Sequence, residues 1–337
     1  MTHPSTFVAA AVQAAPVFLD LDATVDKAVG LIAEAAAHGA SLIAFPETWI
    51  PTYPVWIFGA AGWGDRVAAR VHARMHQNSM MIGSAPFQRL CDAAREARAV
   101  VVMGATEKLS PSAGSLYNSQ FFIGDGGEFL GVHRKIMPTY TERNVWAYGD
   151  GSTLNVFDSR VGRIGGLICW EHWMPLARFA MHAMHEAVHV AAWPDVSEMH
   201  QLASRHYAFE GKCFVICVGS YMALEHIPRD FELYDAIAEM GDVGAGPNEF
   251  LPGGSGIIGP DGAWIAGPVN GREEIVYGEI DLSRLIEERL LLDTVGHYNR
   301  PDIFELTVNK QATPHVRWID KGSPERPPCQ SEDAPPK

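Results

Sequence analysis

Apolar residues near the start of the chain follow two different periods. Residues 8–13 and 41–45 form two nearly continuous apolar runs of strand length. Between them, residues 22–38 place apolar side chains every three to four positions, which is the period of an amphipathic helix. This order predicts a β-α-β unit, and therefore a partly parallel sheet with helices over its faces.

The same alternation continues through most of the chain. Two turn sequences, Gly124-Asp125-Gly126-Gly127 and Pro260-Asp261-Gly262, each predict a β-hairpin. The remaining expected elements are the hairpin strands at residues 117–123 and 128–135, the second hairpin at 255–265, strands at 99–105, 163–168, 187–192 and 214–219, and helices at 65–77, 86–98, 175–185 and 199–210. Both halves end in a hairpin, which favours an α/β fold of two sheets stacked face to face with helices outside.

Two segments depart from this alternation. Residues 225–252 carry Gly, Pro and acidic residues with little periodicity, so they are a candidate lid, contact loop or mobile segment. Residues 320–337 are polar and rich in Pro, which predicts a disordered tail. We therefore expect a single domain over residues 1–319, followed by this tail.

Composition narrows the class of protein. Hydrophobic residues make up 47% of the 337 positions, so a substantial core is expected. The formal net charge of -14, without any basic stripe, argues against a nucleic-acid partner. No basic region precedes the first apolar run, and no run is long enough to span a membrane, so we expect neither a secretory signal nor a membrane partner. Five cysteines at irregular spacing fit reduced thiols in a cytoplasmic protein.

The most informative thiol is Cys169, which lies between the apolar run 163–168 and the helix predicted from Pro175. A thiol where a strand meets the start of a helix can project into a cleft, and the free N–H groups there favour the reactive thiolate. The alternative is core packing, because free cysteine is among the most buried residue types.

Charged residues beside two other apolar strands are costly unless they are paired or functional. Glu47 follows the strand 41–45, at the sheet edge where open α/β sheets bind their ligands. The alternative is that it caps the next turn or pairs with an arginine. Lys135 ends the strand 128–135 and would ordinarily be a solvated charge, while Glu142 fits a capping-box acid. A glutamate can take a thiol proton as general base, and a lysine can hold negative charge that develops on a substrate, so Glu47, Lys135 and Cys169 make chemical sense together.

These segments resemble the three catalytic motifs of the nitrilase (carbon–nitrogen hydrolase) superfamily, in the family's order and at its typical separations. The motifs are Phe45-Pro46-Glu47, His133-Arg134-Lys135-Ile136-Met137-Pro138-Thr139 with Glu142-Arg143, and Cys169-Trp170-Glu171. The resemblance continues through residues 146–152, 190–194 and 296–302 and covers roughly residues 8–307. The second motif and residues 296–302 look more like nitrilases than amidases.

The resemblance implies a Glu47-Lys135-Cys169 triad with Glu142 as an assisting second acid, and a structural hydrogen-bonding role for Glu171. It also implies an α-β-β-α sandwich that dimerises into an eight-layered core, and further assembly of the homo-oligomer into spirals or filaments. No cofactor is implied.

The implied reaction converts a nitrile and water to a carboxylic acid and ammonia. Cys169 attacks the nitrile carbon with Glu47 as base, giving a thioimidate. Water then releases ammonia, and a second hydrolysis frees the acid from a thioester. Lys135 and the backbone N–H of Trp170 stabilise the anionic species.

Aromatic residues near the motifs are candidates for a substrate pocket with flat apolar walls, suited to aromatic or arylaliphatic nitriles. They are Tyr53, Trp170, His172 and Trp193, together with the adjacent Pro194. Core packing is the alternative for each of them. His172 stands where Asn is common in some branches of the family, which leaves the substrate branch open.

Two further groups of residues favour packing over chemistry. His182, His185 and His189 recur at near-helical spacing, but no carboxylate or cysteine completes a known ligand pattern, so we expect no metal. Cys213 and Cys217 lie four apart on a buried strand and share one face.

Three other functions remain open. An amidase or carbamoyl hydrolase would use the same residues, and a cyanide-converting enzyme would share the nitrilase motifs. A catalytically silent assembly protein is disfavoured, because it has no reason to keep a desolvated Glu, Lys and Cys.

Overall fold

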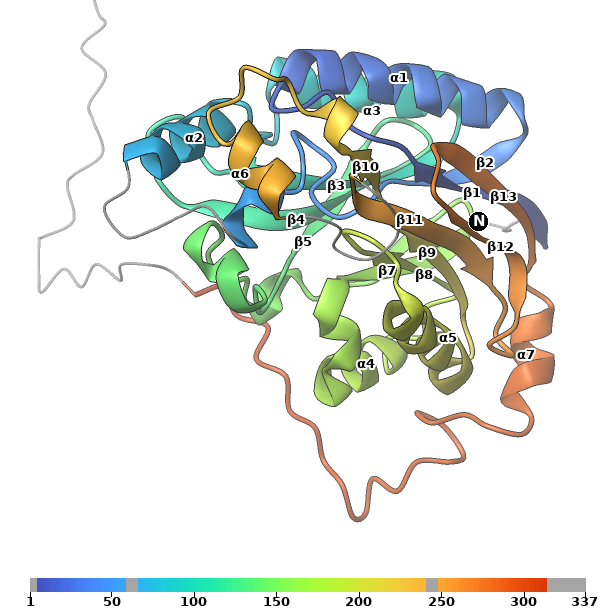
Figure 1. Cartoon of the computed structure of the whole chain (residues 1–337). Helices are drawn as coiled ribbons and strands as arrows, with labels where there is room; N and C mark the ends of the chain where they lie inside the picture. Colours follow the sequence, from blue (N-terminus) through green and yellow to red (C-terminus); the bar gives the residue numbers. More distant parts are fainter. Residues whose placement is uncertain (1–4, 59–65, 241–247, 314–337) are drawn as a thin grey trace, which may run out of the picture.

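The computed structural model describes residues 5–58, 66–240 and 248–313 (Figure 1). The tail expected at residues 320–337 lies outside these ranges, as does residue 65 at the start of one expected helix.

Six strands form the first sheet, in the order β13-β1-β2-β3-β4-β5. Strands β1 to β3 run parallel to one another, whereas β4, β5 and β13 are antiparallel to their neighbours. The strands are β1 (Thr6–Gln13), β2 (Ala40–Ala44), β3 (Val100–Lys108), β4 (Leu116–Ile123), β5 (Phe129–Arg134) and β13 (Glu274–Asp281).

The second sheet has the order β10-β11-β9-β8-β7-β6, and β12 pairs with β11. Its parallel centre is β7, β8 and β9, and its outer pairs are antiparallel. The strands are β6 (Phe157–Ser159), β7 (Gly162–Ile168), β8 (Val188–Ala192), β9 (Phe214–Val218), β10 (Tyr221–Ala223), β11 (Glu249–Ile258) and β12 (Trp264–Asn270).

Helices cover the outer face of each sheet. Figure 1 shows α1 (Leu21–Ala37) and α3 (Ala85–Ala97) above the first sheet, and α4 (Pro175–His182) and α5 (Glu198–Gly211) below the second. The remaining helices are α2 (Arg66–Gln77), α6 (Tyr234–Glu239) and α7 (Arg284–Arg289).

Alternation within the strands builds the layers. In β1, Ala9 and Ala11 belong to the core between the two sheets, whereas Ala10 and Val12 pack with the apolar residues of α1 and α3. Successive side chains of a strand point to opposite faces, so both faces of this apolar strand are buried. The expected four-layer α-β-β-α sandwich is therefore confirmed.

The second half contains elements that the sequence pattern missed. The strands β6, β10 and β13 and the helices α6 and α7 were not expected. The segment 225–252 is not one loop, because it contains α6 and the start of β11. The helix expected over 175–185 ends at His182, and His185 adopts a left-handed φ of 55° that ends helical hydrogen bonding.

Among the described residues, no helix has both the length and the apolar composition needed to cross a membrane.

Candidate active site

The two sheets bring the three motifs together at the carboxyl ends of their strands. Glu47 follows β2, Lys135 follows β5, and Cys169 follows β7. The first two come from one sheet and the third from the other. The cluster thus lies where the ends of the two sheets meet, which is where α/β sheets usually bind ligands.

Lys135 is the centre of the cluster. Its Nζ donates hydrogen bonds of 2.7 Å to Glu47 Oε1 and 2.7 Å to Glu142 Oε2, and all three side chains are buried. Burial alone would lower the pKa of Lys135, but the neighbouring Cys169, Glu47 and Glu142 raise it above its ordinary value. The ammonium therefore stays protonated and neutralises part of the acidic cluster.

Glu47 has one oxygen held and one free. Its Oε1 also accepts a 2.6 Å hydrogen bond from Asn118, while Oε2 has no hydrogen-bond partner among the described residues. Burial raises the pKa of Glu47 to about 7, although Lys135 acts in the opposite direction. A carboxyl group with a pKa near neutrality and a free oxygen suits a general base.

Cys169 faces these carboxylates from the opposite sheet. One oxygen of Glu47, one of Glu142 and Cys169 Sγ all lie within 4.8 Å of one another. Burial and the nearby Glu47 raise the pKa of the thiol well above its ordinary value, and Lys135 and the N–H of Trp170 offset this only in part. The resting group is a neutral thiol, so it needs a base to become a nucleophile.

The helix begins at Pro175, as expected, but Cys169 does not lie at its N-terminus. Cys169 begins the 3₁₀ helix η4 (Cys169–Trp173), and α4 begins only at Pro175. The thiol therefore does not lie at the N-terminus of an α-helix, and the N–H of Trp170 is the donor that lowers its pKa. The residue has a left-handed φ of 55°, which turns the chain sharply at the end of β7.

Glu47, Glu142 and Cys169 together offer the ligand atoms of a possible metal site, but Lys135 already lies beside them. Its ammonium is 2.7 Å from both carboxylates. A metal ion would meet a like charge there, whereas acid–base chemistry uses the ammonium directly.

Glu142 belongs to η2 (Tyr140–Asn144) and serves two purposes. Its Oε2 accepts a 2.6 Å hydrogen bond from the N–H of Thr139, as in the capping box that the sequence indicates. The same carboxylate binds Lys135, and its Oε1 accepts a 2.8 Å hydrogen bond from Tyr53. The local cap and the charge cluster therefore share one side chain.

Glu171 ties the second and third motifs together. Its Oε1 accepts a hydrogen bond from Ile136 N, and its Oε2 accepts one from Ile168 N and one from His133 Nε2, all between 2.7 and 2.8 Å. Burial would raise the pKa of Glu171, but His133 and these hydrogen bonds lower it. These three neighbouring groups keep Glu171 ionised, and their hydrogen bonds join the loop of the second motif to that of the third.

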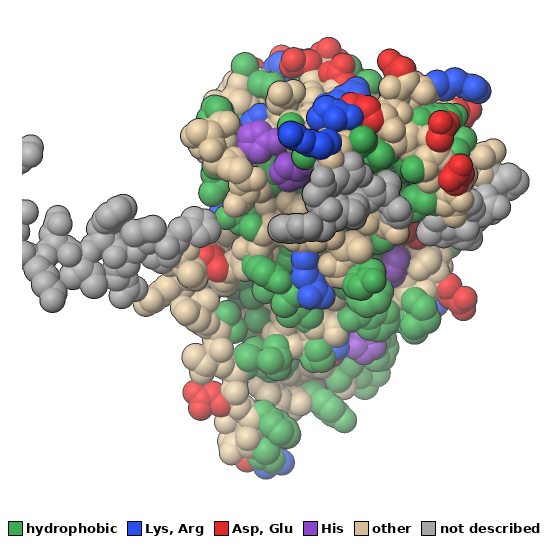
Figure 2. All heavy atoms as spheres, turned by 60° about the vertical axis from the view of Figure 1, so that its left-hand side comes forward, with side chains coloured by type: hydrophobic (Ala, Val, Ile, Leu, Met, Phe, Trp, Pro, Cys, Tyr) green, Lys and Arg blue, Asp and Glu red, His purple; other side chains and the backbone are tan. Residues whose placement is uncertain are grey.

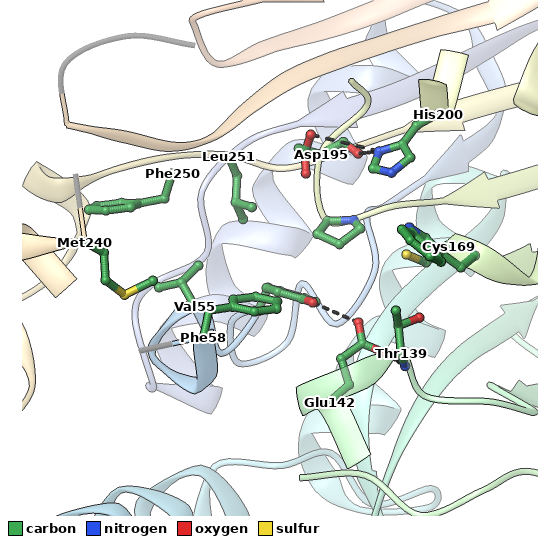
Figure 3. A pocket seen from close by; sticks show the side chains of 13 residues that line it. Val55, Phe58, Thr139, Glu142, Cys169, Asp195, His200, Met240, Phe250 and Leu251 are labelled. Carbon is green, nitrogen blue, oxygen red and sulfur yellow. Dashed lines mark hydrogen bonds and ion pairs between the residues drawn. The ribbon is translucent and has the colours of Figure 1, made fainter. Parts of the chain in front are cut away.

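A cavity of about 270 Å³ opens in front of Cys169. Figure 3 shows Cys169, Glu142 and Thr139 at one end and Phe58, Met240 and Phe250 at the other. The lining residues are Tyr53, Val55, Phe58, Thr139, Glu142, Cys169, Trp170, Pro194, Asp195, His200, Met240, Phe250 and Leu251. The cavity therefore has a reactive polar end and an apolar far end.

The expected substrate contacts divide into two groups. Tyr53, Trp170 and Pro194 line the cavity. His172 and Trp193 do not, because both are buried behind it. His172 instead contacts the Cys169 carbonyl, and Trp193 Nε1 donates a 3.1 Å hydrogen bond to Ser204.

Sequence reasoning missed Asn118 and the far wall of the cavity. A signal for Asn118 existed, since Asn118-Ser119-Gln120 are consecutive polar residues inside the otherwise apolar β4. Met240, Phe250 and Leu251 carried no signal, because they lie in the segment 225–252 and only the fold brings them near Cys169.

The other groups singled out in the sequence are structural. Cys213 and Cys217 are buried in one apolar cluster. His182 and His189 are buried beside Glu186, with the His189 Nδ1 2.9 Å from its carboxylate.

Comparison with known proteins agrees with this geometry. The family model "Carbon-nitrogen hydrolase" matches residues 8–289. A nitrilase of Pseudomonas syringae pv. syringae is 42% identical over 91% of this chain and 91% of its own length. An aliphatic nitrilase of Rhodococcus rhodochrous is 40% identical over 93% and 86%, and an arylacetonitrilase of Aspergillus kawachii is 39% identical over 91% and 93%.

Among solved structures, a carbon-nitrogen hydrolase of Helicobacter pylori matches with a TM-score of 0.68, covering 90% of this chain and 98% of that one. The sequence identity is 18%, so this match speaks for the fold alone.

Proposed function

Because this chain belongs to the carbon–nitrogen hydrolase family, with relatives named nitrilases at about 40% identity over most of its length, we propose that it hydrolyses an organic nitrile to a carboxylic acid and ammonia. The observation that carries the proposal is the buried Glu47, which has one unpartnered oxygen and whose carboxylate lies within 4.8 Å of the neutral thiol of Cys169.

In this reaction Cys169 is the nucleophile and Glu47 the general base. The thiol proton passes by way of Glu47 to the nitrile nitrogen while sulfur bonds to carbon, which gives a covalent thioimidate. Water then adds with Glu47 again taking a proton, ammonia leaves, and a second water hydrolyses the thioester to the acid and the free thiol.

Lys135 and Glu142 support these steps in different ways. The Lys135 ammonium and the Trp170 N–H stabilise negative charge that develops beside the sulfur. Glu142 also accepts a hydrogen bond from Lys135 and lines the cavity, so it assists as a second acid near the substrate.

The organic part of the substrate is apolar. With the nitrile carbon at Cys169, its substituent extends toward Phe58, Met240 and Phe250 (Figure 3). Burying apolar and aromatic surface against these side chains favours aromatic or arylaliphatic nitriles over cyanide, which would leave the far end of the cavity empty.

An ammonia-release screen tests the proposal. The substrates are phenylacetonitrile, benzonitrile, an aliphatic dinitrile, cyanide and a simple amide, and Cys169→Ala is the control. We expect turnover of the aromatic nitriles and none by the folded Cys169→Ala variant. Turnover of the amide alone would replace the proposal with an amidase, and substantial activity of Cys169→Ala would remove Cys169 from the mechanism.

We further propose that copies of the chain associate, first as dimers and then as a larger homo-oligomer. Figure 2 shows hydrophobic side chains gathered on the lower half of one face, while most charged side chains lie on the upper half. The outer surfaces of α4 and α5 also expose Leu176, Met199, Leu202 and Phe209. Exposed apolar residues concentrated on two adjacent helices favour a protein–protein contact.

A further inference from the structure

A row of buried hydrogen-bonding side chains runs from the backbone of Cys169 away from the cavity, and the reaction above uses none of them. His172 Nδ1 lies 2.7 Å from the Cys169 carbonyl oxygen, and His172 Nε2 lies 3.0 Å from His189 Nε2. His189 Nδ1 lies 2.9 Å from Glu186 Oε2. Each of these three side chains is at most 1% exposed.

The partners determine where the protons lie. A carbonyl oxygen only accepts, so His172 Nδ1 carries a proton and donates it to Cys169 O. Burial and His189 lower the pKa of His172 well below its ordinary value, so this ring is neutral and its Nε2 accepts from His189 Nε2. The Glu186 carboxylate accepts hydrogen bonds from His189 Nδ1 and from the Tyr207 hydroxyl.

Neighbouring groups keep Glu186 ionised and hold the ring of His172 in place. Burial would raise the pKa of Glu186, but His189 and His182 lower it to about 2. Arg178 and Glu210 are further charged neighbours: Arg178 donates to the His172 carbonyl at 3.0 Å and to Glu210. The ring of His172 stacks on Trp193 at 4.9 Å between centroids, which fixes its plane.

We propose that His172, oriented by His189 and Glu186, is a positioning residue for the nucleophile. Its Nδ1–H holds the Cys169 carbonyl and thereby the left-handed backbone that directs Sγ toward Glu47. A non-glycine residue in this conformation is strained and persists only where its surroundings fix it. The inference rests on the proposed role of Cys169.

Two substitutions of His172 distinguish its Nδ1 hydrogen bond to Cys169 from its Nε2 contact with His189. In His172→Asn, the side-chain Nδ2 takes the place of Nδ1 and can still donate to Cys169 O, but it cannot reach His189. In His172→Gln, the side-chain amide reaches toward His189, but no donor remains at the Nδ1 position. We compare kcat, KM and the rate at which iodoacetamide alkylates Cys169, with Cys169→Ala giving the background alkylation.

We expect His172→Asn to stay within about threefold of the unsubstituted protein, and His172→Gln to lose about tenfold or more in kcat and in alkylation rate with KM nearly unchanged. This loss corresponds to one buried hydrogen bond. Equal losses in both variants would overturn the positioning role, whereas alkylation without nitrile turnover in the unsubstituted protein would overturn the proposed function instead.

A second measurement, of where the protons lie on the histidine rings, uses the unsubstituted protein and therefore does not depend on a variant folding. The ¹⁵N chemical shifts of the unsubstituted protein distinguish proton-bearing from bare ring nitrogens. We expect a neutral His172 with its proton on Nδ1 and a bare Nε2 that accepts the hydrogen bond from His189. A proton on Nε2 of a neutral His172 would overturn the proposal, because Nδ1 could not then donate to Cys169.

Discussion

At the scale of single residues, the chemistry depends on how one carboxyl group is shared. Glu47 Oε1 accepts hydrogen bonds from Lys135 and Asn118, and Oε2 has no hydrogen-bond partner among the described residues. Because Cys169 is a neutral thiol, the rate of the proposed reaction should depend on the fraction of Glu47 that is ionised. The hydrogen bond from Asn118 favours the ionised form, so it should control the pH at which the enzyme becomes active.

We therefore expect kcat/KM to rise with pH through a limb near pH 7, because Glu47, whose pKa burial raises to about 7, accepts the thiol proton only when ionised. Asn118→Leu removes a hydrogen bond to the carboxylate, so the limb should move to higher pH by roughly one unit, or about 1.4 kcal/mol. The measurement is the pH profile of kcat/KM on the best nitrile.

Tyr53→Phe is the matched control for this profile. It removes a buried hydrogen bond to Glu142 and leaves the bonds to Glu47 in place. Its limb should stay where it is, even if its turnover falls. An unshifted limb in Asn118→Leu would show that another group sets the pH dependence.

At the scale of elements, strand ends and the turns that follow them direct the reactive groups. Gly104 in β3 lies directly beneath the turn that carries Glu47, and a Cβ there would be 1.8 Å from Pro46 O. No side chain fits between β3 and this turn. The position of Glu47 therefore depends on a glycine that lies more than fifty residues away in sequence.

Gly104→Ala should displace this turn and lower kcat at least about tenfold, because a small misplacement of a catalytic group is costly. Overpacking should also destabilise the fold by about 1–3 kcal/mol. Kinetics and denaturant unfolding measure the two effects. The control is Gly30→Ala in α1, where a Cβ meets nothing within 4 Å.

The control should keep full activity and gain about 0.5–1 kcal/mol from the higher helix propensity of alanine. If Gly104→Ala behaved like Gly30→Ala, the close approach of β3 to the turn would not matter for catalysis.

At the scale of the whole molecule, packing of one sheet on the other assembles the cluster, and the outer helices keep apolar side chains exposed, where we propose that other copies bind. Residues from both sheets form the central apolar layer, which includes Phe122 of β4 and Val190 of β8. The same packing brings Cys169 against Glu47 and Lys135. Leu176 on α4 and Leu202 on α5 remain 68% and 51% exposed.

Replacing Leu176 and Leu202 with Glu should reduce the size of the oligomer, because two buried charges would oppose an apolar contact. Sedimentation velocity at several concentrations measures the change. Leu109→Glu, at an exposed position just beyond β3, is the control and should leave the distribution unchanged. A distribution that is identical in all three proteins would locate the contact elsewhere.

Most elements of the first half could be predicted from the sequence, because buried strands there are long and apolar and turns carry glycine. The edge strand β13 escaped notice, since it is mostly half-exposed and pairs with β1 from the far end of the chain. Resemblance located Glu47, Lys135, Glu142 and Cys169. Nearness to the motifs suggested His172 and Trp193 as pocket residues, but both are buried and neither lines the cavity.

By itself, the sequence determined the layers of the sandwich and the identity of the reactive groups, because hydrophobic period and short motifs are local properties of the chain. Tertiary structure decided which charges meet and what they do to one another. The raised pKa values of Glu47 and Cys169 arise from burial between two sheets, and the contact of His172 with the Cys169 carbonyl arises from a turn that the sequence pattern did not reveal. These effects depend on distance and desolvation, which exist only once the sheets have packed.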